Sequence, residues 1–88
     1  MIYKLSNIGI VILNYNGEKF LKKFLPDILK YSRNSKIYII DNCSEDNSVR
    51  FIKNNFKKIN IIQLKKNYGY SKGYNLGIKN IKEKILCL

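Results

Sequence analysis

Residues 8–13 read Ile-Gly-Ile-Val-Ile-Leu, and the residues after them, 14–17, read Asn-Tyr-Asn-Gly. The first run is unbroken, apolar and mostly β-branched, which is typical of a strand that is buried on both faces of a parallel sheet. The polar tetrapeptide is a turn signal. This stretch therefore predicts a parallel sheet covered by helices, with a loop at the carboxyl end of its first strand.

The same alternation continues along the chain. Further apolar runs at 36–40, 59–64 and 85–88 predict three more strands, and helical patterns lie between them. The order βαβαβαβ, with right-handed crossovers, predicts an α/β fold with a doubly wound parallel sheet. We expect the last strand to lie beside the first and to form an edge of the sheet.

The first predicted helix has an apolar stripe that we expect to pack on the sheet. The stripe comprises Phe20, Leu21, Phe24, Leu25, Ile28 and Leu29. Pro26 falls inside this pattern and should kink the helix or begin a second one. Lysines occupy the other faces, so the helix could also lie on an anionic membrane. We favour packing on the sheet, because a sheet without a helix on it would be exposed.

The bulk properties exclude several classes of protein. With 88 residues the chain forms one small domain at most, and it contains no histidine. That excludes Ser-His-Asp and Cys-His catalysis and histidine-based zinc sites. No apolar run approaches the ~20 residues of a membrane-spanning helix, and the first residues do not resemble a signal peptide. Cys43 and Cys87 are far apart, so we expect reduced thiols in a cytoplasmic protein.

The formal net charge is +11, which attracts anions such as nucleic acid, anionic lipid or phosphorylated small molecules. Seven tyrosines could stack on bases. However, most fall singly in different elements, the basic residues are nearly all lysine, and no RNP-like motif appears. We therefore expect no nucleic-acid partner, but a basic module for RNA or anionic lipid stays an alternative.

Ligands of doubly wound sheets bind beyond the carboxyl ends of the strands, which selects the loops 14–17, 41–46 and 67–73. The candidate binding residues of the first two loops are Asn14, Tyr15, Asn16, Asp41, Asn42, Ser44 and Asp46. A carboxylate at a strand end can accept a hydrogen bond from a base imide or a ribose hydroxyl. The alternative is that both aspartates bond only to loop and helix-cap amides, and that the tyrosine belongs to an ordinary turn. Both interpretations stay open here.

The third loop leads into a glycine-rich helix. Its glycines allow close backbone approach, a helix amino terminus near Ser71 favours an anion, and its lysine could reach a phosphate. The candidate residues are Asn67, Gly69, Lys72, Gly73 and Asn75. Gly73 and Gly77 share one helical stripe, so packing on the sheet alone would also explain them. The stretch is neither a GxGxxG fingerprint nor a Walker A sequence.

Taken together, the segments 12–17, 39–48 and 67–77 resemble family 2 glycosyltransferases, and the match spans residues 8 to 88. The signatures V-x-x-N-Y-N-G and D-N-x-S-x-D-x-S are those of the rhamnosyltransferase-like branch. Each motif alone is weak, but three in order at family-like spacing are specific.

The resemblance implies a glycosyltransferase-A (Rossmann-like) fold that transfers sugar from a nucleotide diphosphate sugar to a glycan or lipid-linked acceptor, as in bacterial polysaccharide biosynthesis. By resemblance, Asn14–Asn16 holds the base, Asp41 contacts it, and Asn67–Asn75 lines the base and ribose side. The family also uses Mg²⁺ or Mn²⁺, bound by an Asp-x-Asp motif after the fourth strand, whereas this sequence ends at Leu88.

We therefore expect residues 1–88 to be the nucleotide-sugar-binding, amino-terminal part of an incomplete glycosyltransferase domain. It should contain no catalytic residue and no metal ligand, and it should not transfer sugar alone. The exposed sheet edge predicts self-association. Association with the inner face of the membrane is a further possibility, and an inert remnant is the remaining alternative.

Overall fold

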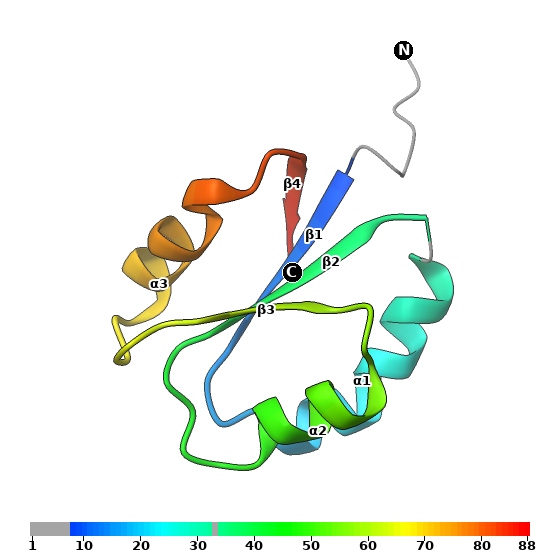
Figure 1. The fold of residues 1–88 in the computed structure, drawn as a ribbon, viewed down its shortest axis with the longest axis horizontal. Coiled ribbons are helices and arrows are strands. Elements are labelled where there is room, and N and C mark those ends of the chain that lie inside the picture. Colours follow the sequence, from blue (N-terminus) through cyan, green and yellow to red (C-terminus); the bar gives the residue numbers. More distant parts are fainter. Residues whose placement is uncertain (1–7, 33) are drawn as a thin grey trace.

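The computed structural model describes residues 8–32 and 34–88. Strands and helices alternate along the whole described chain (Figure 1). The elements are β1 (Ile8–Asn14), α1 (Glu18–Tyr31), β2 (Lys36–Asp41), α2 (Ser48–Asn55), β3 (Asn60–Gln63), α3 (Tyr70–Gly77), the 3₁₀ turn η2 (Ile78–Asn80) and β4 (Lys84–Cys87). The predicted order βαβαβαβ is confirmed, with strand ends shifted by a residue or so.

The strands form one parallel sheet in the order β3-β2-β1-β4. In its register Asn14, the last residue of β1, lies opposite Asp41, the last residue of β2, which in turn lies opposite Gln63 of β3. The sheet therefore places the carboxyl ends of these three strands side by side. As predicted, β4 pairs with β1 and forms an edge.

Helices cover both faces of the sheet, as Figure 1 shows, with α1 and α2 on one face and α3 on the other. The larger core lies under α1 and α2 and is built from Ile10, Ile12, Leu21, Leu25, Ile37, Ile39, Ile52 and Ile59. The smaller core lies under α3 and contains Val11, Ile40 and Tyr74. Branched side chains of β1 and β2 point alternately into the two cores, which is why their runs read as continuously apolar.

The stripe predicted for α1 is wrong at its aromatic positions. Leu21 and Leu25 are buried against the sheet, but Phe20 is 52% exposed and Phe24 is 41% exposed. Neighbouring residues are about 100° apart around a helix. A stripe that includes both residue i and residue i+1 is therefore wider than the side of the helix that the sheet covers. The two phenylalanine rings lie instead against each other, with centroids 4.7 Å apart.

Of the two outcomes expected at Pro26, a kink or a second helix, the second helix does not form, because α1 continues through this residue to Tyr31. Pro26 lies on an exposed side of the helix. Water can therefore satisfy the carbonyl that loses its intrahelical donor, and the helix tolerates the ring there.

Close packing explains the two glycines of α3. A Cβ on Gly77 would lie 2.2 Å from Cδ1 of Ile40, and one on Gly73 would lie 2.9 Å from Nδ2 of Asn42. Neither distance is compatible with a normal contact, so a larger residue would require the side chain of Ile40 or Asn42, or α3 itself, to shift. Both glycines therefore pack closely on the sheet, and contact of Gly73 with a ligand stays a prediction.

Candidate functional site

The loops that follow β1, β2 and β3 are joined to one another by side-chain hydrogen bonds. Most of these bonds connect residues that are more than 20 positions apart in the sequence. The parallel register brings the loops together, and the polar side chains hold them in place. All three predicted loops therefore belong to one region at the carboxyl end of the sheet.

Asn14 and Asp41 form the buried centre of this region and are 3% and 2% exposed. Nδ2 of Asn14 donates to Oδ1 of Asp41 at 2.9 Å and to Oγ of Ser48 at 2.9 Å. Asp41 also accepts from Ser44, from Oγ at 2.6 Å and from the backbone N–H at 3.0 Å. Oδ1 of Asn14 accepts the N–H of Gly17 at 3.1 Å. This centre ties the ends of two strands to the beginnings of α1 and α2.

Asn16 fixes the first loop against the second. Its Oδ1 accepts the backbone N–H groups of Glu45 at 2.7 Å and Asp46 at 3.3 Å, and its own N–H donates to Oγ of Ser44 at 2.9 Å. Its φ of 53° lies in the left-handed region that asparagine tolerates better than most residues. Cys43 in the second loop also has a positive φ, 64°, so both loops turn sharply.

Asp46 binds the first turns of two helices. One carboxylate oxygen accepts the N–H of Glu18 at 3.1 Å, and the other accepts the N–H of Ser48 at 3.0 Å. Burial opposes the charge, but the hydrogen bonds from Ser48 and Glu18 outweigh it, so the pKa of the Asp46 carboxyl lies below its usual value. The negative charge at both helix amino termini is favourable for the same reason as a helix cap.

Asn42 attaches the third loop to the end of β2. Its Nδ2 donates to the carbonyl of Gly69 at 2.9 Å, and its Oδ1 accepts the N–H of Tyr68 at 3.0 Å. Asn67 closes the same loop locally, because its Oδ1 accepts the N–H of Gly69 at 2.8 Å. The helix α3 then begins at Tyr70, so Ser71 lies inside the helix and does not cap it.

The remaining candidates are exposed around this buried network. Tyr15 is 45% exposed, and Asn67, Lys72 and Asn75 are also open to solvent. Lys66 and Lys72 place their Nζ atoms 5.2 and 5.1 Å from the ring centroid of one tyrosine, Tyr68. Sequence reasoning did not select Tyr68. Its signal is the pair of lysines at i−2 and i+4, which a loop ending in a helix brings to one ring.

The candidates fall into two groups: buried residues whose hydrogen bonds join the loops, and exposed residues that surround them. No buried side-chain nitrogen or oxygen in residues 8–32 and 34–88 lacks a partner within the chain. Asp41 and Asp46 do accept hydrogen bonds from loop and helix amides, as the alternative interpretation of the loops supposed. Contact of any of these residues with a nucleotide stays a prediction.

The carboxylates do not fit a metal site. In the part of the chain that the structure describes, no three Asp, Glu or Cys side chains come together as possible ligands. The oxygens of Asp41 and Asp46 also accept N–H and O–H donors inside the chain, so a cation would compete with these hydrogen bonds.

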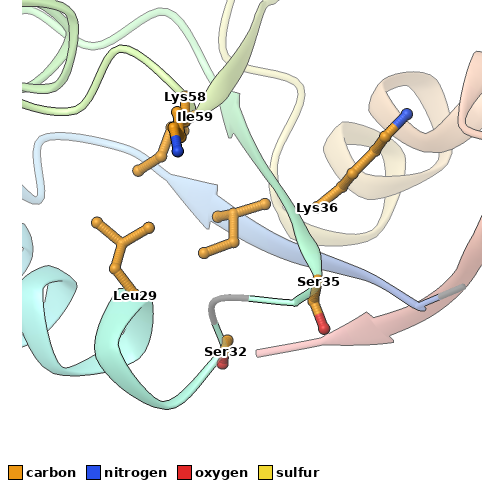
Figure 2. Close-up of a pocket in the computed structure, with 7 residues that line it drawn as sticks. Leu29, Ser32, Ser35, Lys36, Lys58 and Ile59 are labelled. Carbon is orange, nitrogen blue, oxygen red and sulfur yellow. The ribbon is translucent and has the colours of Figure 1, made fainter. Parts of the chain in front are cut away.

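A pocket of about 390 Å³ lies at the other end of the sheet, away from the three loops (Figure 2). Leu29, Ile37 and Ile59 form its apolar part. Lys36 borders the pocket but points away from Leu29 and Ile59, and its Nζ lies 3.4 Å from Oε2 of Glu83. The pocket therefore has few converging polar groups and does not resemble a site for a charged ligand.

Solved structures share this fold. S. aureus TarS is 22% identical with a TM-score of 0.77, over 92% of this chain and 16% of TarS. S. aureus TarS 1-349 in complex with UDP is 22% identical with a TM-score of 0.78, over 92% and 26%. A mannosyltransferase from Pyrobaculum calidifontis, in complex with GDP-Man and Mn²⁺, is 15% identical with a TM-score of 0.68, over 86% and 24%. The chain thus spans about a quarter or less of these proteins.

No curated protein sequence matches the chain. The sequence profile named Glycosyl transferase family 2 matches residues 9–88, which is nearly the whole chain. The fold is the Rossmann-like, glycosyltransferase-A arrangement of the structural neighbours. The rhamnosyltransferase-like branch stays a prediction, but the profile and the fold agree that the chain belongs to glycosyl transferase family 2.

Proposed function

We propose that residues 1–88 are the nucleotide-sugar-binding part of a glycosyltransferase and that the three joined loops hold the nucleotide. The observation that carries the proposal is the network around Asn14 and Asp41, which fixes three strand-end loops in one rigid arrangement. In parallel sheets this edge is where ligands bind. A rigid rim lowers the entropy cost of binding a small ligand.

Within this proposal the buried residues position the loops and the exposed residues touch the ligand. Tyr15 offers a ring for a base, and Asn67 and Asn75 offer amides for the base and ribose. Lys66 and Lys72, on either side of Tyr68, offer ammonium groups for phosphate. Asp41 orders the loops through the hydrogen bonds that its oxygens accept inside the chain. Its contact with the base, which the family resemblance implies, is part of the same proposal.

The structural neighbours support a nucleotide diphosphate sugar as the ligand. TarS 1-349 has been solved with UDP and with UDP-GlcNAc, and the mannosyltransferase with GDP-Man and Mn²⁺. Transfer of the sugar to a glycan or lipid-linked acceptor, with a divalent metal, is proposed for a complete enzyme. We expect residues 1–88 alone to bind without turnover.

The test is calorimetric titration of UDP, UDP-glucose, GDP-mannose and dTDP-rhamnose into the chain, with and without Mn²⁺, at moderate salt. Saturable binding of one nucleotide without metal would support the proposal and identify the donor. No binding by a chain shown to be folded would overturn it and favour an inert remnant. Binding that any polyanion displaces equally, with a steep salt dependence, would favour a polyanion-binding module.

A matched pair of variants tests the position of the ligand. Lys72 lies at the candidate rim and Lys79 lies in η2, and both are exposed. Lys72→Ala should weaken nucleotide binding about tenfold, whereas Lys79→Ala should leave it nearly unchanged, because a phosphate contact is worth roughly 1–2 kcal/mol. Equal effects of the two variants would show that the net charge, and not the rim, attracts the nucleotide.

The proposal also includes self-association through β4, since all four residues of this edge strand are exposed. An unpaired strand edge with apolar side chains favours pairing with another chain. A cytoplasmic location is part of the same proposal, and the two free cysteines support it. None of the described helices is both long enough and apolar enough to span a bilayer.

A further inference from the structure

One flank of α1 repeats a pattern in which a lysine directly precedes an aromatic residue. The pairs are Lys19-Phe20, Lys23-Phe24 and Lys30-Tyr31. Their spacings of four and seven residues are close to whole helical turns, so the pairs lie above one another. At about 100° per residue, the three aromatic side chains fall within roughly 40° of one another, and the lysines form an adjacent row.

The aromatic row faces solvent along the length of the helix. Phe20, Phe24 and Tyr31 are 52%, 41% and 77% exposed. The Nζ atom of Lys23 lies 5.3 Å from the Phe24 ring centroid, and that of Lys30 lies 5.6 Å from the Tyr31 ring centroid. Packing of the core does not account for these three side chains, because the leucines of α1 fill the contact with the sheet.

The row lies on the side of α1 that faces away from α2. The contacts with α2 use Lys22, whose Nζ lies 5.6 Å from the Phe51 ring, and Glu18, which accepts the N–H of Asn47 at 3.1 Å. Both residues lie about 120° or more around the helix from the aromatic row. The row is therefore not covered by α2.

The lysines of this flank are available to an anion. Lys22 pairs with Glu18 at 2.8 Å, but no acidic partner of Lys19, Lys23 or Lys30 occurs within the described part of the chain. Asp27, which is exposed, is the acidic residue on the same flank. The flank thus combines three cations with one anion, in a chain whose net charge is +11.

We propose that the Lys-aromatic flank of α1 docks on the surface of an anionic lipid bilayer. Phenylalanine and tyrosine side chains partition into the headgroup region, and adjacent lysines neutralise lipid phosphates. Charge complementarity favours this partner over a second copy of the chain, because two copies would bring their lysine rows together. The inference is independent of nucleotide binding.

The experiment is sedimentation of the chain with vesicles of phosphatidylcholine alone and of phosphatidylcholine mixed with phosphatidylglycerol. We expect binding to the mixed vesicles that exceeds binding to phosphatidylcholine by at least about tenfold. The double variant Phe20→Ser/Phe24→Ser should lower binding to the mixed vesicles by about tenfold or more. Both residues are half-exposed, so the variant should fold, and circular dichroism checks this. Equal binding to both vesicle types would overturn the proposal.

Matched charge variants separate a specific surface from general attraction. Lys19→Glu/Lys23→Glu and Lys57→Glu/Lys58→Glu change the net charge equally, but the second pair lies between α2 and β3. We expect the first to lower binding at least about tenfold more than the second, and Asp27→Asn to strengthen binding. Equal losses would show attraction by net charge alone and overturn the proposal. The proposal would also be overturned if the Phe20→Ser/Phe24→Ser variant kept its binding to vesicles and only lowered the molecular mass in light scattering. That result would show that a second copy of the chain covers the flank.

Discussion

The strands β2 and β4 lie on either side of β1, yet their environments are opposite. Both pair with β1 in parallel. In β2, Ile37, Ile39 and Ile40 are almost fully buried, and the last residue, Asp41, is the centre of a hydrogen-bond network. In β4 every residue is exposed, including Leu86 at 51%.

Coverage of the sheet causes this difference. β2 lies under α1 and α2 on one face and under α3 on the other, and β3 closes its outer edge. Among the strands that the structure describes, β4 has a neighbour only on the β1 side (Figure 1). Both strands begin with lysine followed by isoleucine. Their apolar sequences alone therefore do not reveal how much each strand contributes to stability.

Removing the carboxylate at the end of β2 should have the largest effect. Asp41→Ala would leave Oγ and N–H of Ser44 without their acceptor and remove one acceptor of Asn14, and should cost about 2–4 kcal/mol of unfolding free energy. Cys87→Ala at the end of β4 should cost less than about 0.5 kcal/mol. Urea denaturation measures both. If the two losses were similar, the network would not stabilise the fold as its geometry indicates.

Overpacking β2 should have the next largest effect. Gly77→Ala places a methyl group against Ile40 and should cost about 1–3 kcal/mol, because the side chain of Ile40 or α3 itself must shift. Shortening the neighbour in the double variant Gly77→Ala/Ile40→Ala should cost less than the sum of the two single changes. Thermal denaturation of the three variants gives this coupling, and strict additivity would contradict the close approach.

Acid should weaken the region around β2 through Asp46. Its folded-state pKa is lowered, so the ionised carboxylate stabilises the fold above its unfolded pKa, and this contribution is lost as the pH falls below about 4. We expect the loss to be about 1 kcal/mol or less. The variant Asp46→Asn should lack this acid dependence in denaturation measured between neutral and acidic pH. An unchanged pH profile would assign the dependence to other carboxyl groups.

The smallest effect on stability is expected in β4 itself. Leu86→Ser should change the unfolding free energy by less than about 0.5 kcal/mol, because the side chain is already half-exposed. It should nevertheless reduce self-association, since it removes apolar surface from the free edge. Light scattering at high concentration provides the measurement. A wild-type chain that stays monomeric there would remove the reason for this prediction.

The sequence predicted the arrangement of strands and loops because the patterns that encode them are local. Alternating apolar runs and helical stripes identified β1 to β4, and the turn residues after them marked the loops. The sequence did not reveal that Phe20 and Phe24 are exposed. A stripe shows which residues share a side of a helix, but the neighbouring elements decide which of them are covered.

The candidate site was predictable to a similar degree. Its loops were identified, but the division into buried and exposed residues was not. Asn14, Asp41 and Asn42 are buried because of hydrogen bonds to residues 26 to 34 positions away. A single sequence does not contain such long-range pairings in readable form. Tyr68 was overlooked because the two lysines around its ring come together only through the fold.

The strand order has a consequence for how the molecule is made. β1 receives its first partner, β2, after one helix, but its second partner, β4, begins about 70 residues after β1 ends. During synthesis, β1, β2 and β3 can assemble with α1 and α2 while one side of β1 is still open. The closing of that side depends on the most distant pairing of the sheet, and such non-local pairings form slowly. The nascent chain therefore carries an open β1 edge until β4 emerges from the ribosome.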